Sequence, residues 1–391
     1  MPRIAVLGAG PIGIEAALAA AERGWPFTVY EAAPTVAGHV RAWGHVRLFS
    51  PWSMNLSDRV RRVLGDAAPA GGALPTGDEL VDRVYEPVAA ALGDRVRTGT
   101  RVRAVAREGL LKHEEIASDE RSRRPFRLLV SGPDGQEHVD RADVVIDCTG
   151  TYGNPNALGD GGIPAPGEEA LRGRIQRQLP DLTRDARRWA GRRILLTGSG
   201  HSAQTAAREL AALAGQAPGT RVFWAVRGGD RSFGAIEGDS LLARAELNRD
   251  AAELAAGASD AVDVQFGVAT ERLGERDGRI AVALRNGAVG ELEVDRVLAL
   301  NGGVGDASIY RQLQVHECYA TAAPMNLSAA LLAQGGGGGD CTAVAPLGPD
   351  TLLNPEPGFF ILGAKSYGRN SQFLLRIGWQ QVDDAFGLIA R

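Results

Sequence analysis

The residues of this chain whose types and spacing could do chemistry are a set of glycines and one acid. Three glycines directly follow an apolar run at 4–7 and are separated by one and by two residues: Gly8, Gly10 and Gly13. Where a strand turns into a helix, the first such glycine permits the tight turn, the second lets a pyrophosphate approach the backbone, and the third lets the helix pack on the sheet. Glu31 ends the next apolar run, at 27–30, where a carboxylate would accept hydrogen bonds from the hydroxyls of an adenosine ribose. The spacing predicts a dinucleotide site whose phosphates face the amino end of a helix over 12–23.

The same pattern occurs a second time, in the middle of the chain. An apolar run at 193–197 is followed by small residues at the same spacing: Gly198, Gly200 and Ala203. A helix is predicted from 202 to 214, and the next strand, 221–226, ends in Arg227 instead of an acid. Because a guanidinium can bind a 2′-phosphate through paired charge-assisted hydrogen bonds, this second site favours NADPH over NADH. The alternative is that Arg227 only caps a solvated strand end.

Composition narrows the class of protein. A chain of 391 residues is too long for one core and suits two or three domains. The net charge of −4 and the lack of a long basic block give no reason to expect a nucleic-acid partner. No apolar run is long enough to span a bilayer, and the first strand begins within three residues of Met1, which leaves no room for a signal peptide. We therefore expect a soluble, cytoplasmic protein with no membrane partner.

The three cysteines argue against two kinds of site. They are widely spaced: Cys148, Cys318 and Cys341. Such spacing supports neither a disulfide framework nor a four-thiolate metal site, and we expect no bound metal. Cys148 is expected to be a small packed residue at the end of a strand. The run of five glycines at 335–339 predicts a surface loop, because each glycine costs backbone entropy and buries nothing.

The order of these motifs resembles a known family. The first glycine motif with Glu31, the Thr149-Gly150 turn, the second glycine motif and a late strand ending in Gly363 are similar to those of flavoproteins with two dinucleotide-binding domains. Within that family, the chain most resembles the flavin-containing monooxygenase and thioredoxin-reductase-like branch. Redox-active reductases of this kind pass electrons to a dithiol, but this chain has no CxxC pair.

The resemblance covers nearly the whole chain and implies its fold class. It implies an α/β protein with two Rossmann-like dinucleotide-binding domains, in which the FAD domain is interrupted by the NAD(P)H domain. On this basis we place the first part of the FAD-binding domain at 1–165, the NAD(P)H-binding domain at 166–295, and the C-terminal part of the FAD-binding domain at 296–391.

The resemblance also implies which residues contact each cofactor. The FAD contacts would be Gly8, Gly10, Pro11, Ile12, Gly13, Glu31, Thr149, Gly150 and Gly363. The NADPH contacts would be Gly198, Gly200, His201, Ser202 and Arg227. Two departures limit the comparison. The family's Gly-Asp pair, which binds the ribityl chain, is replaced by a segment ending in Lys365, and the aromatic and His of a common monooxygenase fingerprint are replaced by Leu171 and Arg177.

Two segments are candidates for the surroundings of the flavin ring. In the segment 47–55, the candidate catalytic residues are Ser50, Trp52 and Asn55, with Phe49 as a second aromatic wall. The alternative is a buried loop whose Trp and Phe fill the core. His39 and His45 flank this segment without the spacing of metal ligands.

The second candidate segment is 365–372, which is dense in polar residues. Here Lys365, Tyr367 and Arg369 could reach the flavin ring or its ribityl chain. The alternative is a surface loop that precedes a closing helix over 371–389, with Ser371 as its N-cap.

These observations lead to an expected function with two alternatives. We expect an FAD-dependent, NADPH-consuming oxidoreductase of the flavin-monooxygenase type, which oxygenates a nitrogen or sulfur atom of a small-molecule substrate with molecular oxygen; a homodimer is left open. One alternative is an NAD(P)H-dependent reductase that inserts no oxygen and uses no redox dithiol. The other is a flavin-binding regulator without catalytic activity.

Overall fold

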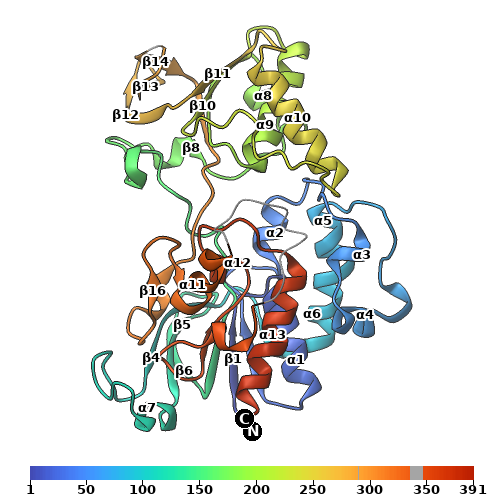
Figure 1. Cartoon of the computed structure of the whole chain (residues 1–391), viewed down its shortest axis with the longest axis vertical. Helices are drawn as coiled ribbons and strands as arrows, with labels where there is room; N and C mark the ends of the chain where they lie inside the picture. The colour runs from blue at the N-terminus through green and yellow to red at the C-terminus, as the bar shows by residue number, and fades with distance from the viewer. Residues whose placement is uncertain (289, 335–346) are drawn as a thin grey trace. The chain divides into compact units, whose positions relative to one another are not determined.

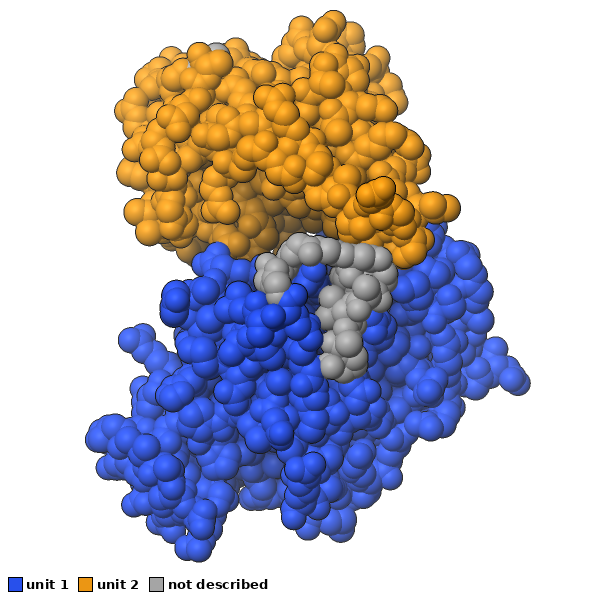
Figure 2. All heavy atoms as spheres, viewed as in Figure 1, with its two compact units in different colours: residues 1–154, 304–391 blue, residues 155–303 orange. Residues whose placement is uncertain are grey.

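The computed structural model describes residues 1–288, 290–334 and 347–391, so the glycine run at 335–339 and Cys341 lie outside the described residues (Figure 1). The chain forms two compact units: unit 1 is residues 1–154 with 304–391, and unit 2 is residues 155–303 (Figure 2). Each unit is built on a five-stranded parallel sheet with helices. The predicted α/β fold with two Rossmann-like units is confirmed.

The boundaries of these units differ from the predicted divisions at 165/166 and 295/296. The connector after 154 belongs to unit 2, because Gly159 forms a β-bridge with Thr270 and the carbonyl of Pro166 accepts the backbone N–H of Leu273 at 2.8 Å. The strand β15 (Arg296–Ala299), which the sequence division assigned to the last segment, lies in the sheet of unit 2 beside β9 (Arg193–Thr197). Backbone pairing, which a sequence pattern cannot show, places both segments.

The parallel sheet of unit 1 has the order β18-β7-β1-β2-β3. Its strands are β1 (Ile4–Leu7), β2 (Phe27–Tyr30), β3 (Val96–Arg97), β7 (Val144–Asp147) and β18 (Phe359–Ile361). The strand β1 pairs with β2 on one side and with β7 on the other. This reversal of strand order opens a crevice at the carboxyl ends of the strands, which is where ligands bind in open α/β sheets.

Alternate side chains of β1 pack into different cores, as the period of a strand requires. Ile4 and Val6 pack with the four main helices of unit 1: α1 (Pro11–Glu22), α4 (Asp58–Leu64), α6 (Glu86–Leu92) and α13 (Leu375–Ile389). Ala5 and Leu7 pack with a three-stranded antiparallel sheet: β4 (Arg101–Arg107), β5 (Phe126–Ser131) and β6 (Glu137–Ala142). The parallel sheet is therefore the middle of three layers.

Shorter elements complete unit 1. They are α2 (Gly38–Ala42), α3 (Trp52–Asn55), α5 (Gly77–Leu80), α7 (Asp119–Arg123), α11 (Met325–Ala333), α12 (Ala364–Tyr367), β16 (Glu317–Cys318) and β17 (Ala323–Pro324). No described helix is both long and apolar enough to cross a membrane.

The closing helix α13 begins four residues later than predicted. Its N-cap position is Leu374 and not Ser371. The side chain of Asn370 accepts a hydrogen bond from the backbone N–H of Gln372 at 2.9 Å, which holds the chain in a local turn instead of a helix. As a result Phe373 and Leu375 are available to line the site described below.

The parallel sheet of unit 2 has the order β11-β10-β9-β15-β8. Its other strands are β8 (Ile175–Gln176), β10 (Arg221–Val226) and β11 (Val262–Phe266), and its helices are α8 (Ala186–Trp189), α9 (His201–Gln216) and α10 (Leu242–Ala255). An antiparallel sheet is formed by β12 (Ala269–Arg276), β13 (Arg279–Arg285) and β14 (Glu291–Val294). Here β9 pairs with β10 on one side and β15 on the other, which repeats the reversal of unit 1.

Candidate functional site

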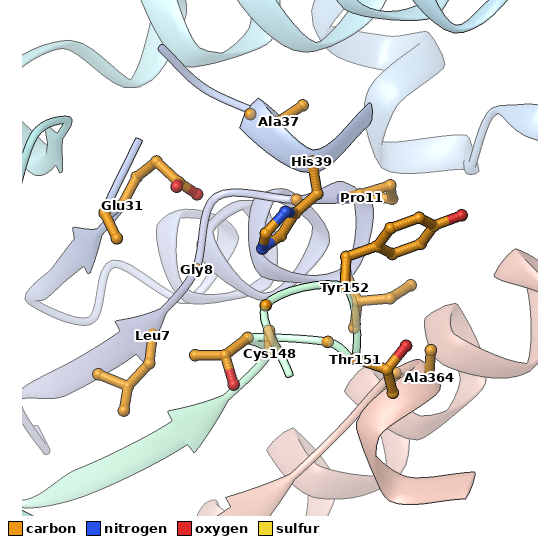
Figure 3. Close-up of a pocket in the computed structure, with 18 of the residues that line it drawn as sticks. Leu7, Gly8, Pro11, Glu31, Ala37, His39, Cys148, Thr151, Tyr152 and Ala364 are labelled. Carbon is orange, nitrogen blue, oxygen red and sulfur yellow. The ribbon is translucent and has the colours of Figure 1, made fainter. Parts of the chain in front are cut away.

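A cavity of about 340 Å³ lies in unit 1 at the carboxyl ends of its parallel strands (Figure 3). Pockets for small molecules and cofactors have volumes of roughly 300–1,000 Å³. Most of the FAD contacts that the sequence implies line it: Gly8, Gly10, Pro11, Ile12, Glu31, Thr149, Gly150 and Gly363. The tertiary structure thus brings residues from four strand ends together at the predicted crevice.

The three glycines of the first motif meet three different demands. Gly8 has a φ of +92°, and a Cβ there would lie 2.8 Å from the carbonyl oxygen of Cys148. A Cβ on Gly13 would lie 1.9 Å from the carbonyl oxygen of Gly8, so only glycine lets α1 pack this closely on the turn. A Cβ on Gly10 would meet no protein atom within 4 Å. Gly10 therefore faces the open side of the turn, where a ligand can approach the protein backbone.

The start of α1 and the side chain of Glu31 both present polar groups to the cavity. Gly10 is the N-cap of α1, and no side chain caps the helix there, so its first turn presents backbone donors and a partial positive charge. The Oε2 atom of Glu31 accepts the N–H of Ala9 and its Oε1 atom accepts the N–H of Ala33, both at 2.8 Å. These bonds fix the carboxylate at the cavity wall, and each oxygen keeps capacity for a further donor such as a sugar hydroxyl.

Three aromatic rings cover part of the cavity. The ring of Tyr152 stacks on His39 with 5.9 Å between centroids and on Trp43 with 6.4 Å. All three residues line the cavity, and the Nε1 atom of Trp43 is buried with no hydrogen-bond partner among the described residues. Neither Trp43 nor Tyr152 is predicted from the sequence to have a role. The position of Tyr152, just after the predicted Thr149-Gly150 turn, was the signal that could have identified it.

The three candidate catalytic residues of the segment 47–55 do not line the cavity. Ser50 donates its hydroxyl hydrogen to Oδ1 of Asn55 at 2.9 Å, and the Nδ2 atom of Asn55 donates to the Ser50 carbonyl at 2.8 Å. Trp52 is buried in the helix-side core and stacks with Arg83, whose guanidinium carbon lies 5.0 Å from the ring centroid. These are the contacts of a packed segment made of α3 and the residues before it, and they favour the alternative of a buried segment that fills the core.

Lys365 also differs from its predicted role, because its ammonium group is used by the protein. It is 2% exposed and donates to Oδ2 of Asp147 at 2.6 Å, to the Asp306 carbonyl at 2.7 Å and to the Thr149 hydroxyl at 3.1 Å. Three donors thus meet three acceptors. The hydroxyl of Thr149 in turn donates to Oδ1 of Asp147 at 2.7 Å. Lys365 therefore supports the cavity wall from behind instead of reaching into the cavity.

Two further residues of the last segment have separate roles. Tyr367 is 1% exposed and does not line the cavity; it packs edge-on against Phe373, which does. Gly363 does line the cavity, and its φ of +77° favours glycine. Its backbone N–H donates to the side chain of Gln381 in α13 at 2.9 Å, which ties this turn to the closing helix.

The second glycine motif has the same local geometry in unit 2. Gly198 has a φ of +108°, and a Cβ there would lie 2.2 Å from the carbonyl oxygen of Leu300. Gly200 is the N-cap of α9, and a Cβ on it would meet no protein atom within 4 Å. The carbonyl of Gly198 accepts the indole N–H of Trp224 at 2.7 Å. The turn is therefore fixed, and its open side again faces away from protein.

The remaining predicted contacts of unit 2 are exposed. His201 and Ser202 form the first helical turn of α9, and Arg227 directly follows β10. The guanidinium of Arg231, in the same loop, lies 4.8 Å from the ring centroid of Phe266. The two arginines thus lie after the strand whose end meets an adenosine ribose in folds of this type.

Neither described cysteine has the character of a redox nucleophile in this site. Cys148 lines the cavity, and its burial raises the pKa of its thiol well above the usual value, which keeps it protonated at neutral pH. Cys318 is buried in β16, which is not part of the cavity. Within the described ranges, the structure contains no cluster of three or more His, Cys, Asp or Glu side chains that could hold a metal ion.

No protein-family model and no curated protein sequence matches the chain. Solved structures do match its fold. A bacillithiol disulfide reductase, Bdr (YpdA), from Bacillus cereus has a TM-score of 0.69 and 20% identity over 100% of this chain and 98% of that chain. DfoA, the cadaverine monooxygenase of Erwinia amylovora solved with FAD, has a TM-score of 0.67 and 13% identity over 99% and 94%.

A third matching structure is the thioredoxin reductase of T. acidophilum, with a TM-score of 0.59 and 14% identity over 100% of this chain and 99% of that chain. The matches therefore include members of both halves of the predicted branch. They confirm the resemblance at the level of the fold, along the whole chain.

Proposed function

We propose that the protein is an oxidoreductase that binds FAD in unit 1 and NADPH in unit 2. The observation that supports this most is the cavity at the strand-order reversal of unit 1, lined by the glycine turn and by Glu31. A Cβ at Gly10 would occupy the space that a pyrophosphate needs, and the carboxylate of Glu31 is held where a ribose would lie. The residues present thus fit this cofactor.

The roles of the chain's residues in FAD binding follow from these contacts. The first turn of α1 holds the phosphates with backbone donors, and Glu31 accepts from the adenosine ribose. The bound flavin would supply the hydride and electron chemistry. Lys365 and Asp147 hold the Thr149 turn in place, and the rings of His39, Trp43 and Tyr152 limit the access of water to the cavity.

For unit 2, we propose that Arg227 selects the 2′-phosphate of NADPH. The turn at Gly198 and the uncapped start of α9 would hold the pyrophosphate, in the same way as their counterparts in unit 1. An arginine after β10, in the place that Glu31 takes in unit 1, supplies a bidentate donor set for phosphate. Arg231 is the second candidate for this contact.

The reaction that we propose first is oxygenation of a nitrogen or sulfur atom of a small molecule, with molecular oxygen as co-substrate. The protonated state of the Cys148 thiol and the absence of a CxxC pair in the sequence argue against a thiol relay beside the cavity. DfoA, a cadaverine monooxygenase, has the same fold. The second candidate is an NAD(P)H-dependent reductase that inserts no oxygen, which the similarity to a bacillithiol disulfide reductase favours. A flavin-binding regulator is the third.

Rapid-mixing spectroscopy of the purified chain distinguishes these functions. We expect the protein to release FAD and not FMN on denaturation, and NADPH to bleach the flavin absorbance. When the reduced protein is mixed with oxygen, a monooxygenase should show an absorbance phase that precedes the return of the oxidised spectrum and that a substrate amine or thioether accelerates. A direct return would favour the reductase, and failure of NADPH to bleach the flavin would favour the regulator. Release of FMN, or no flavin after reconstitution with FAD, would contradict the proposal.

A further inference from the structure

His39 is a cavity residue whose polar atoms are not used by the protein. It lies in α2, and Figure 3 shows its ring projecting into the cavity between Glu31 and Tyr152. Among the described residues its side chain makes a ring contact with Tyr152 but no hydrogen bond. An imidazole that lines a ligand cavity and has no protein partner is available to the ligand.

The surroundings of His39 favour an anion as that ligand. Gly10 and Pro11, at the uncapped amino end of α1, line the same cavity, and Arg101 of β4 lines it as well. The end of a helix with free amide donors attracts negative charge. The carboxylate of Glu31 acts electrostatically on His39, and two backbone N–H groups already hold this carboxylate.

Imidazole is the side chain whose unperturbed pKa lies nearest to neutral pH, and His39 is the histidine that lines this cavity. Three charged residues line the cavity together with His39: Glu31 after β2, Arg101 in β4 and Asp306 after the return of the chain to unit 1. Ordinary carboxyl and guanidinium groups titrate well outside the range from pH 6 to 8.5. Burial raises the pKa of the Cys148 thiol and of the Tyr30 and Tyr152 hydroxyls, all above that range.

We propose that His39 takes up a proton from solvent when FAD binds and, as an imidazolium, donates a charge-assisted hydrogen bond to the FAD pyrophosphate. This inference rests on the proposed binding of FAD to unit 1. It adds a pH-dependent contact to a site whose other phosphate contacts are backbone groups. The contact links retention of the cofactor to the proton concentration.

The sign of this dependence follows from linkage. Partial burial lowers the pKa of His39 in the free protein, Glu31 opposes this shift and Arg101 adds to it, so the net shift is downward and the ring is neutral at pH 8. A bound pyrophosphate favours the charged ring and raises its pKa. FAD should therefore bind more tightly as pH falls through the pKa of the complex. The gain is complete below the pKa of the free protein.

The test is the dissociation constant of FAD for the FAD-free full chain, measured by quenching of flavin fluorescence from pH 8.5 to pH 6. The wild-type constant should fall roughly tenfold as the pH is lowered, the lower end of what one hydrogen bond to a charged group contributes. The His39→Gln variant should bind FAD weakly with no pH dependence, and the His39→Lys variant should bind FAD tightly at every pH. His138→Gln is the matched control, because His138 lies in β6 and does not line the cavity.

The outcomes separate this inference from the proposed function. The role of His39 would be overturned if the wild-type protein bound FAD with no pH dependence, or if the His39→Gln variant kept the wild-type pH dependence. A wild-type protein that binds no FAD at any pH would instead overturn the proposed cofactor. Far-ultraviolet circular dichroism of each variant shows that it is folded, and the opposite expectations for Gln and Lys keep the test decisive if one of them is unstable.

Discussion

The glycine turns of the two units share one backbone geometry but are anchored differently. In unit 1 the turn at Gly8 lies against the Cys148 carbonyl. Asp147, just before Cys148, forms a buried ion pair with Lys365, and the hydroxyl of Thr149, just after it, donates to Asp147. In unit 2 the turn meets the Leu300 carbonyl, and the next residue, Asn301, accepts a neutral hydrogen bond from Thr197 at 2.9 Å. The same dinucleotide geometry is therefore supported by charge in one unit and by neutral groups in the other.

The two turns also differ in what surrounds them. The turn of unit 1 opens into a cavity whose walls come from β2, β4, α2, the segment after β7 and the start of α13. The candidate contacts of unit 2, at 201, 202 and 227, are exposed. A cofactor held in unit 1 would be retained, whereas a coenzyme in unit 2 would exchange, as the proposed reaction requires. The following variants test these differences.

The largest expected effect is on the stability of unit 1, from breaking the buried ion pair between Lys365 and Asp147. Lys365→Met should lower the free energy of unfolding by about 3–5 kcal/mol, because it leaves the buried carboxylate of Asp147 without its cation. Chemical denaturation measures this change. The double variant Lys365→Met with Asp147→Asn should be less destabilised than Lys365→Met alone. Equal losses in both would show that the unpaired charge is not the cause.

The next effect concerns the glycine that packs α1 on its turn. Gly13→Ala should lower the free energy of unfolding by about 3 kcal/mol, the upper end for overpacking, since its Cβ would lie 1.9 Å from a backbone oxygen. Gly10→Ala is the matched control. Its Cβ meets no protein atom, so it should keep the thermal stability of the FAD-free protein and lose FAD affinity. A Gly10→Ala variant with unchanged FAD binding would argue against pyrophosphate at this turn.

In unit 2 the expected effect is on coenzyme choice. Arg227→Ala should weaken the binding of NADPH by about 1.5–3 kcal/mol, the value of a hydrogen bond to a charged group, and leave the binding of NADH nearly unchanged. Steady-state kinetics with both coenzymes measures the difference. An equal loss for both would show that Arg227 acts elsewhere, and Arg231→Ala would then be tested in the same way.

The smallest expected effect is that of removing every thiol. A variant with Ser or Ala at all three cysteines, Cys148, Cys318 and Cys341, should still oxidise NADPH in response to substrate at the wild-type rate per bound flavin. Electrons would then reach the acceptor without a thiol relay. Rapid mixing checks this: normal reduction by NADPH with no onward transfer would show that a thiol relay exists and would contradict the proposed monooxygenase.

The sequence by itself determined the parts of the fold that depend on local backbone geometry. The turns at Gly8 and Gly198 need positive φ, and Gly13 needs the absence of a Cβ, so these residues predicted two strand–turn–helix units. The acid after one strand and the arginine after the other were equally visible, because each lies at a fixed interval from its glycines.

The tertiary structure alone decided which other side chains reach the cavity. Trp52 and Asn55 follow the first glycine motif in sequence, but they lie in the short helix α3, which buries them and satisfies the polar groups of Asn55 locally. Lys365 follows Gly363 closely, yet its cation lies beside Asp147, 218 residues earlier in sequence. His39 and Tyr152 come together from separate segments. Contacts of this kind depend on long-range pairing of strands, and local spacing cannot specify where such a side chain will find its partner.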